Sequence, residues 1–234
     1  MNSKYLKLKY KEDYYRKSQA EMIEESRKEL EKINQGVPLH KVLGHIEMTD
    51  VKIDLSKDVL IPRYETEELI LLAKKYIKED SRVLDLCSGS GYIGLAVKKM
   101  TNANIVASDI SKEAIEQINI NKEINNLEIE VVESDLFENI NGKFDVIISN
   151  PPYIPEETTL SNSVLDYEPH LALFGGADGN DLYKRIVNEY KTFLNPRGVI
   201  LFEISEDNVA FLKSKDFEII KDINGKSRMA FKLS

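Results

Sequence analysis

The chain of 234 residues has few cysteines and histidines and no long apolar stretch, which excludes several common structural features. Its single cysteine, Cys87, excludes an internal disulfide and fits a reducing compartment such as the cytoplasm. Its three histidines are scattered without the spacing of metal ligands, so we expect no metal site. The longest apolar stretch, near residues 69–77, is interrupted by Lys74 and Lys75, so we expect no segment that spans a membrane.

Dense clusters of basic residues are missing as well. The formal net charge is −8, and no run of Lys or Arg is dense enough to neutralise a nucleic-acid backbone. We therefore expect no stable binding to DNA or RNA. The amino terminus has no apolar stretch like that of a signal peptide, so we expect a cytoplasmic protein without membrane attachment. Hydrophobic residues make up 42% of the chain, which is enough for one α/β domain with a small appendage.

Strands and helices are expected to alternate along most of the chain. The apolar pattern predicts strands at 82–86, 104–109, 128–133, 144–149 and 197–204, with helices at 91–100, 111–124 and 178–194. Such alternation predicts right-handed crossovers and a parallel sheet. Two last runs, 217–223 and 228–233, are joined by Asn224-Gly225 and predict a closing antiparallel hairpin.

The beginning of the chain has a different composition. Residues 1–37 are heavily charged with a helical pattern, and we expect a helical region that covers one side of the main domain or docks a substrate. Residues 38–64 are interpreted as a linker with a short hairpin, and residues 65–234 as the main domain. The expected packed positions of the first region are Leu6, Tyr10, Tyr14, Met22, Ile23, Leu30 and Ile33.

The most informative segment is Asn150-Pro151-Pro152-Tyr153, which directly follows the apolar run 144–149. Because proline cannot continue a central strand, the segment is placed at the carboxyl end of a buried strand, where open α/β sheets bind their ligands. An asparagine amide, a fixed proline backbone and a tyrosine ring suit a planar nitrogen group, such as a carboxamide or the exocyclic amine of a base. An ordinary turn that ends a strand is the alternative.

A glycine-rich loop upstream also points to a ligand. It follows a short apolar strand that contains Asp85, and it precedes a helical pattern. Glycines let the backbone approach a ligand closely, and the start of a helix presents free N–H groups. Asp109, which ends the next strand, fits a ribose diol. The small residues of the loop are Cys87, Ser88, Gly89, Ser90 and Gly91.

Two cofactors fit this pattern, a nicotinamide dinucleotide and S-adenosylmethionine (SAM). The glycine spacing alone is compatible with both. Asp85 favours SAM, because a carboxylate at that strand end would meet a cationic amino or sulfonium group and not a pyrophosphate. The segment that begins at Asn150 also favours SAM, since a hydride-transfer enzyme has no evident use for it. The residues therefore favour a methyltransferase over a dinucleotide oxidoreductase.

Several separate segments between Pro38 and Phe231 together resemble the protein-(glutamine-N5) methyltransferases that act on peptide chain release factors, the HemK/PrmC family. The Asn-Pro-Pro-Tyr segment is shared with adenine and cytosine amino-methyltransferases. The Ile-Pro-Arg segment and the Glu-Pro…Gly-Gly…Asp-Gly stretch are more specific to this family. The matching segments are 38–44, 60–67, 83–94, Asp109, 150–155, 166–179 and 222–228.

The resemblance implies a class I SAM-dependent methyltransferase fold of the α/β class. This is a Rossmann-like seven-stranded sheet with a terminal antiparallel hairpin, here with a small N-terminal helical region. It implies SAM as cofactor, S-adenosyl-L-homocysteine as product and no metal. The implied partner is a class 1 release factor, methylated on the amide nitrogen (N5) of the glutamine in its Gly-Gly-Gln (GGQ) motif, in support of translation termination.

The resemblance also implies roles for individual residues. The catalytic set, which also binds the substrate, is Asn150, Pro151, Pro152 and Tyr153. Arg63 and Glu168 are added to the substrate-binding set, although an ion pair that fixes the amino-terminal segment is an equal alternative for Arg63. The cofactor-binding set is Asp85, Cys87, Ser88, Gly89, Ser90, Gly91, Asp109, Asp135, Leu136 and Asn150.

Three of the acidic residues keep two interpretations. Asp85 either orders the methionine end of SAM or caps the loop. Asp109 either holds the ribose hydroxyls or caps the helix that begins near Ser111. Asp135 either faces the adenine amino group or shapes a turn.

The chain departs from the family pattern in four ways. Cys87 replaces the first glycine of the loop, and Tyr64 replaces a proline. Leu136 replaces an aromatic residue, so packing against the adenine would be aliphatic. The helical amino-terminal region is shorter than usual, which leaves the means of substrate docking open.

Other functions remain as alternatives. A glutamine of a ribosomal protein is a second substrate of similar chemistry. A nucleic-acid amino-methyltransferase is disfavoured by the acidic charge balance and by the lack of a target-recognition domain. A SAM-binding module without catalysis is disfavoured because binding SAM does not require the segment that begins at Asn150.

Overall fold

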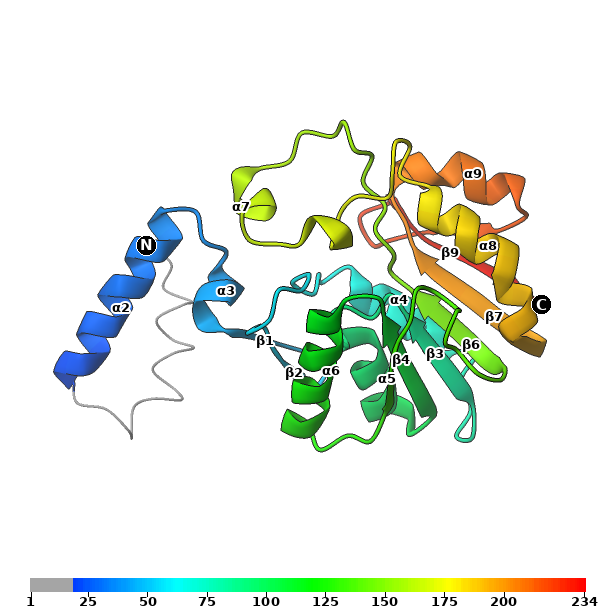
Figure 1. The fold of residues 1–234 in the computed structure, drawn as a ribbon, viewed down its shortest axis with the longest axis horizontal. Helices are drawn as coiled ribbons and strands as arrows, with labels where there is room; N and C mark the ends of the chain where they lie inside the picture. Colours follow the sequence, from blue (N-terminus) through cyan, green and yellow to red (C-terminus); the bar gives the residue numbers. More distant parts are fainter. Residues whose placement is uncertain (1–18) are drawn as a thin grey trace.

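The computed structural model describes residues 19–234 of the chain. Figure 1 shows a twisted sheet between layers of helices, with α2 (Gln19–Asn34) at the opposite end of the molecule from the carboxyl terminus. After α2, the elements that precede the sheet are α3 (Leu39–Leu43), β1 (His45–Met48), β2 (Val51–Asp54) and α4 (Thr66–Lys74). The alternating part then contains β3 (Arg82–Leu86), α5 (Tyr92–Thr101), β4 (Asn104–Asp109), α6 (Lys112–Ile124), β5 (Glu130–Glu133) and β6 (Phe144–Ser149). The last part contains α7 (Asn162–Leu165), the 3-10 helix η1 (His170–Ala172), α8 (Asp181–Phe193), β7 (Leu194–Glu203), the 3-10 helix η2 (Glu206–Asn208), α9 (Val209–Ser214), β8 (Glu218–Lys221) and β9 (Ser227–Leu233).

Within the described residues, the main sheet has seven strands in the order β5-β4-β3-β6-β7-β9-β8. The pairs from β5 to β7 are parallel, and β9 joins β7 and β8 as antiparallel neighbours. This order confirms the predicted sheet and its closing hairpin. The chain order reverses direction between β3 and β6, and open α/β sheets bind ligands at the carboxyl ends of the strands at such a point.

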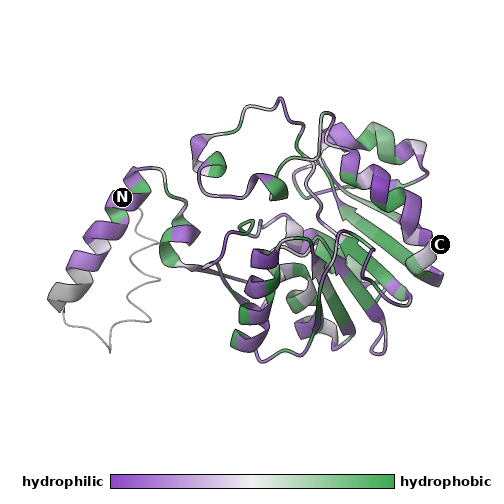
Figure 2. Ribbon diagram, in the orientation of Figure 1, coloured by the Kyte–Doolittle hydropathy of each residue, from purple (hydrophilic) through white to green (hydrophobic). Residues whose placement is uncertain are grey.

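Both faces of the sheet are covered. Central strands are buried almost throughout, as continuous apolar runs in parallel sheets require. One core packs α4, α5 and the start of α6 against the sheet together with the β1–β2 hairpin, and the other packs α8 and α9. Figure 2 shows the resulting contrast between apolar strands and a mostly hydrophilic α2.

The structure differs from the predicted elements at several places, such as β5 and α8, which begin two and three residues later than predicted. Two further differences have a clear cause. Strand β7 begins at Leu194 and not at residue 197, because Leu194 pairs with Phe144 before an irregularity in the register. Arg197 there adopts a positive φ of 67°. The Pro196-Arg197-Gly198 sequence is typical of a turn, so the sequence pattern did not predict a strand at these residues. Helix α9 was not predicted, since a segment of six residues is too short for a helical period to be seen.

The helical prediction for the first region is confirmed for α2 and is otherwise untested, because Leu6, Tyr10 and Tyr14 lie outside the described residues. Helix α2 lies beside α3 and away from the sheet, so the prediction that it covers one side of the main domain is wrong for this helix. Its sequence explains this position, because charged residues occupy most of its surface and leave only a narrow apolar stripe.

Candidate active site

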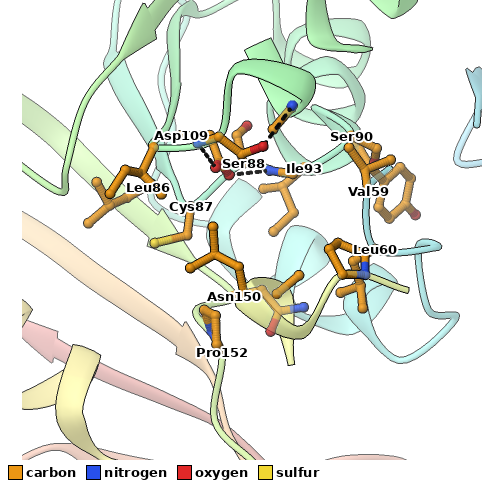
Figure 3. A pocket seen from close by; sticks show the side chains of 18 of the residues that line it. Val59, Leu60, Leu86, Cys87, Ser88, Ser90, Ile93, Asp109, Asn150 and Pro152 are labelled. Carbon is orange, nitrogen blue, oxygen red and sulfur yellow. Dashed lines mark hydrogen bonds between the residues drawn. The ribbon is translucent and has the colours of Figure 1, made fainter. Parts of the chain in front are cut away.

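A single pocket lies at the carboxyl ends of β3, β4 and β6, where the predicted motifs meet. Figure 3 shows Asn150 and Pro152 on one side of this pocket, with Ser88 and Asp109 on the opposite side and Cys87 between them. The linker after β2 closes a third side with Val59. We call the residues from Asp85 to Gly91 together with Asp109 the cradle wall, and those from Asn150 to Tyr153 the acceptor wall.

The backbone of the cradle wall has an unusual conformation. Cys87, Gly89 and Gly91 have positive φ values of 61°, 54° and 82°. Glycine adopts this region without strain, whereas a residue with a Cβ atom does so at a cost. Gly91 is the N-cap of α5, so the loop leads directly to free N–H groups at a helix start.

Asp85 lies beneath the loop and is fully buried. Its Oδ2 accepts hydrogen bonds from the Ser88 hydroxyl and, at 2.8 Å, from the Gly94 N–H. Its Oδ1 is buried without a hydrogen-bond partner. Burial raises the pKa of this carboxyl to about 6 against an ordinary value of 3.8, because the charged form has lost its water. The contacts fit the loop-capping interpretation, and Oδ1 still has its capacity to accept a hydrogen bond or an ion pair.

Asp109 ties the same loop to the start of α6. Its Oδ2 accepts from the Gly89 N–H and its Oδ1 from the Ser111 N–H, both at 2.9 Å. Burial raises the pKa of Asp109 too. The helix-capping contact is therefore present, and the carboxylate also lines the pocket, where each oxygen keeps a lone pair for a ligand hydroxyl.

Leu136 and Asp135 also line the pocket. Leu136 is buried, and Ile110 and Leu182 line the same pocket, so part of its surface is aliphatic. Asp135 pairs with Arg185 of α8 at 2.9 Å. Sequence reasoning missed Arg185, because a charged residue on an amphipathic helix carries no mark of a site.

Asn150 is half-buried and lines the pocket, and its side-chain amide forms no hydrogen bond with any other described residue. The turn that follows it is firmly held. Ile154 donates to the Leu173 carbonyl at 3.0 Å and accepts from the Gly175 N–H at 2.9 Å. A Cβ atom at Gly175 would lie 2.5 Å from the Pro152 carbonyl oxygen. Residue 175 therefore has no space for a side chain, and this close approach of the two backbones requires a glycine there.

Tyr153 is half-buried against the core formed with α8. Burial raises the pKa of its phenol to about 12, so the hydroxyl stays protonated at neutral pH. Gly179, with a φ of 70°, lies so close to Tyr153 that an added Cβ atom would be 2.2 Å from its carbonyl oxygen. The loop after β6 therefore fixes the backbone that carries the tyrosine.

Arg63 and Glu168 contact each other. Arg63 Nη2 donates to Glu168 Oε1 at 2.6 Å, and the buried Glu168 also accepts from the Ile61 N–H at 3.2 Å. The ion pair joins the linker to the loop that contains η1. The structure therefore contains the ion pair that was the alternative interpretation of Arg63. Arg63 also lines the pocket.

A buried acid beside the acceptor wall was missed by sequence reasoning. Glu203 ends β7, one position beyond the residue paired with the end of β6, and it is fully buried. Its Oε2 accepts from the Thr66 hydroxyl at 2.7 Å, and Thr66 lines the pocket. Burial raises the pKa of Glu203. Its place at the carboxyl end of an apolar strand, the same signal that located Asn150, could have revealed it.

The structure thus brings most of the predicted residues to one pocket. Those that do not line it are Asp85, Gly91, Pro151, Tyr153 and Glu168. The predicted residues that line it are Arg63, Cys87, Ser88, Gly89, Ser90, Asp109, Asp135, Leu136, Asn150 and Pro152.

Known proteins are similar in sequence to this chain over most of its length. Residues 64–166 match the family model of the methyltransferase small domain. A release factor glutamine methyltransferase of Borreliella burgdorferi is 37% identical over 198 residues, which span 82% of this chain and 68% of the relative. One of Lactococcus lactis is 36% identical over 210 residues, spanning 85% and 78%. The chain belongs to the release factor glutamine methyltransferase family. The resemblance first seen in the separate motifs is thereby confirmed.

Solved structures confirm the class I SAM-dependent methyltransferase fold of this family member. A methyltransferase from Pyrococcus furiosus matches with a TM-score of 0.61 at 19% identity, covering 78% of this chain and 88% of that chain. The E. cuniculi Mtq2–Trm112 complex, described as responsible for methylation of the eRF1 translation termination factor, matches with a TM-score of 0.54 at 23% identity, covering 76% and 98%. At these identities the likeness shows the fold alone.

None of the helices among residues 19–234 has both the length and the apolarity to cross a bilayer. In the same range, no group of three or more His, Cys, Asp or Glu side chains has the arrangement of a metal site.

Proposed function

We propose that this chain transfers the methyl group of SAM to the side-chain amide nitrogen of the glutamine in the GGQ motif of class 1 release factors. The observation that carries the proposal is the Asn150 side-chain amide, which lines the pocket and forms no hydrogen bond with the other described residues. A substrate amide needs such a partner, because its two N–H donors must be satisfied as it enters a pocket.

The pocket fits SAM by the chemistry of its lining. Asp85 lies behind the lining, and its unpartnered Oδ1 is a buried carboxylate oxygen near the end of β3, suited to a cationic amino group directly or through water. Asp109 offers carboxylate oxygens to ribose hydroxyls, and Leu136 and Ile110 offer an aliphatic surface to adenine. When bound, SAM supplies a methyl group activated by its sulfonium, which is the hard part of the chemistry.

The acceptor wall supplies geometry. Asn150 and Pro152 line the pocket, and Pro151 and Tyr153 adjoin them in the chain. Asn150 Oδ1 and the Pro151 carbonyl each accept one N–H of the substrate amide, which turns the nitrogen lone pair out of conjugation and toward the methyl group, and Tyr153 stacks on the amide plane. As the methyl group is transferred, S-adenosyl-L-homocysteine leaves and the nitrogen releases one of its two protons. Alignment of this kind supplies about 7–11 kcal/mol of a barrier in well-aligned systems. Acceptors placed for the positive charge that develops on nitrogen add electrostatic stabilisation.

The decisive experiment is methyl transfer from radiolabelled SAM to a purified bacterial release factor. A second sample carries the release factor with the GGQ glutamine changed to alanine. We expect label on the first and none on the second. Label on both would contradict the site, and no label on either with SAM bound would favour a ribosomal-protein or nucleic-acid substrate. We place the reaction in the cytoplasm, where release factors act.

A further inference from the structure

One face of α6 carries a stripe of polar side chains that the methyl-transfer chemistry does not use. Glu113, Gln117, Asn121 and Asn125 follow each other at intervals of four, so they line one face of the helix and its C-cap. Gln117 and Asn121 are completely buried. Polar groups are buried at a large cost unless they are hydrogen-bonded, so a stripe of this kind has specific partners.

The partners are the backbone of strand β2 and of the linker that follows it. Asn125 Oδ1 accepts from the Lys52 N–H at 2.9 Å, and Asn121 Oδ1 accepts from the Asp54 N–H at 2.8 Å. Further along, Gln117 Oε1 accepts from the Lys57 N–H at 2.8 Å and Glu113 Oε2 accepts from the Asp58 N–H at 3.0 Å. Side chains of a helix thus cover the edge of β2 that no strand pairs within the described residues.

Asn121 alone in this stripe also reaches the cradle wall. Its Nδ2 donates to the Ser90 carbonyl at 2.8 Å, with a second, longer contact of 3.3 Å to the Asp54 carbonyl. Ser90 lines the pocket, and so does the linker from Asp58 to Arg63 that continues from β2. One buried amide therefore joins two walls of the same pocket.

The packing around Asn121 leaves the two walls little independent freedom. Ile118, one turn earlier on α6, lies 3.2 Å from the place of a Cβ atom at Gly91. The hairpin and the start of α6 share one apolar core with the sheet. A group that fixes the Ser90 carbonyl against the β2 backbone consequently sets the spacing between cradle wall and linker.

We propose that Asn121 is a positioning residue for the methyl-donor pocket, one that couples the linker wall to the cradle wall through a single side-chain amide. The inference rests on the proposed position of SAM in this pocket. Binding of SAM then orders both walls together, and loss of the Asn121 amide lets each wall move by itself. Asn125 is a matched control, because it binds the same strand through the same side chain but does not bind Ser90.

The test compares Asn121→Ala with Asn125→Ala in the full chain. Both variants lose an amide that binds β2, and both are expected to lower thermal stability. We expect the dissociation constant for SAM, measured by calorimetry, to rise about tenfold in Asn121→Ala and to stay within about twofold of the wild type in Asn125→Ala. An equal change in the two variants would overturn the inference.

Amide hydrogen exchange gives a second measurement that a purely structural role would not affect. The Lys52 N–H binds Asn125, so its hydrogen bond survives in Asn121→Ala. SAM should slow exchange at Lys52 in the wild type and in Gln117→Ala, but not in Asn121→Ala. Protection of Lys52 by SAM that persists in Asn121→Ala would overturn the coupling.

A further variant keeps the test informative if Asn121→Ala does not fold. Asn121→Leu fills the space of the amide and removes the donor to Ser90, so we expect the same rise in the SAM dissociation constant; unchanged affinity would overturn the inference. Asp109→Ala separates this proposal from the pocket assignment. If Asp109→Ala binds SAM as the wild type does, the assignment of SAM to this pocket fails and the inference fails with it. If Asp109→Ala weakens SAM binding but Asn121→Ala does not, only the inference fails.

Discussion

The two walls of the pocket differ in whether their polar side chains already form hydrogen bonds within the protein. In the cradle wall, the carboxylates already accept hydrogen bonds from backbone N–H groups, that of Asp85 from Gly94 in the first turn of α5 and that of Asp109 from Gly89 in the loop before α5. In the acceptor wall, the Asn150 amide forms no hydrogen bond with other described residues. The cradle wall is thus assembled by its own contacts, whereas the acceptor wall keeps its capacity for a ligand. Changes in the first should alter cofactor binding, and changes in the second should alter methyl transfer.

The largest expected effect is on the acceptor wall. Asn150→Ala removes an acceptor for the substrate amide, and we expect the rate of methyl transfer to fall by about 1000-fold, the scale of losing a preorganised polar contact at a reacting group. SAM affinity should stay within about twofold, because Asn150 supports no part of the cradle wall by a hydrogen bond. Transfer is measured with radiolabelled SAM and binding by calorimetry.

The control for this variant is Asn162→Ala, the same change at an exposed position of α7. It should leave transfer and binding unchanged. If Asn150→Ala reduces SAM binding and transfer equally, the division of labour between the two walls is wrong.

The next effect is on the cradle wall. Asp109→Ala removes a carboxylate that fixes Gly89 and Ser111 and that faces the pocket. Hydrogen bonds to a charged group contribute about 1.5–3 kcal/mol each, so we expect SAM affinity to fall by about 100-fold. Calorimetry measures the affinity, and transfer at saturating SAM should change much less. If Asp109→Ala instead loses most methyl transfer at saturating SAM and keeps the wild-type affinity for SAM, the assignment of Asp109 to cofactor binding is wrong.

A smaller effect is a pH dependence that arises from Asp85. Its pKa is raised to about 6 in the folded chain, so between about pH 4 and 6 the folded state binds more protons than the unfolded state, and this carboxyl lowers stability as pH rises. A cationic group of SAM favours the ionised carboxylate and lowers its pKa. If SAM lowers the pKa of Asp85 from about 6 to below 5, linkage requires the affinity for SAM to rise by about tenfold from pH 5 to pH 7.

Asp85→Asn provides the comparison for that measurement. An asparagine can still accept from the Gly94 N–H but does not titrate. Its SAM affinity should be weaker at pH 7 and nearly independent of pH over the same range. A wild-type affinity that does not change with pH would show that no cationic group of the ligand approaches Asp85.

The sequence predicted the two walls because each is a short motif at the end of an apolar strand. Asp85 lies near the carboxyl end of β3, Asp109 ends β4 and Asn150 directly follows β6. The carboxyl ends of these parallel strands meet at one edge of the sheet. Motif and topology together therefore determine their proximity. The same argument applies to Glu203, whose position at the end of β7 was not used.

Other parts of the site depend on contacts that no local pattern reveals. Arg185 reaches Asp135 from a helix whose exposed residues are mostly charged, so its partner is decided by tertiary packing. The amides of Asn121 and Gln117 read as ordinary solvated helix positions, because their partners are backbone atoms of a strand far away in sequence. The ion pair of Arg63 with Glu168 was one of two interpretations, and charge alone could not decide between them.

The smallest expected effect concerns Cys87, which stands in the cradle wall where the family has a glycine. Cys87 has a φ of 61°, a conformation that costs residues with a Cβ atom about 1–2 kcal/mol and glycine nothing. Cys87→Gly removes this strain, and Cys87→Ala removes the same sulfur while keeping the strain. Glycine also loses more entropy on folding, so we expect Cys87→Gly to be more stable than Cys87→Ala by about 0.5–1 kcal/mol, measured by denaturant unfolding. Equal stability would show that the loop relaxes around a side chain at residue 87. In that case the cradle wall would be as adaptable as the acceptor wall, and the contrast between the two walls would rest on Asp85 and Asp109 alone.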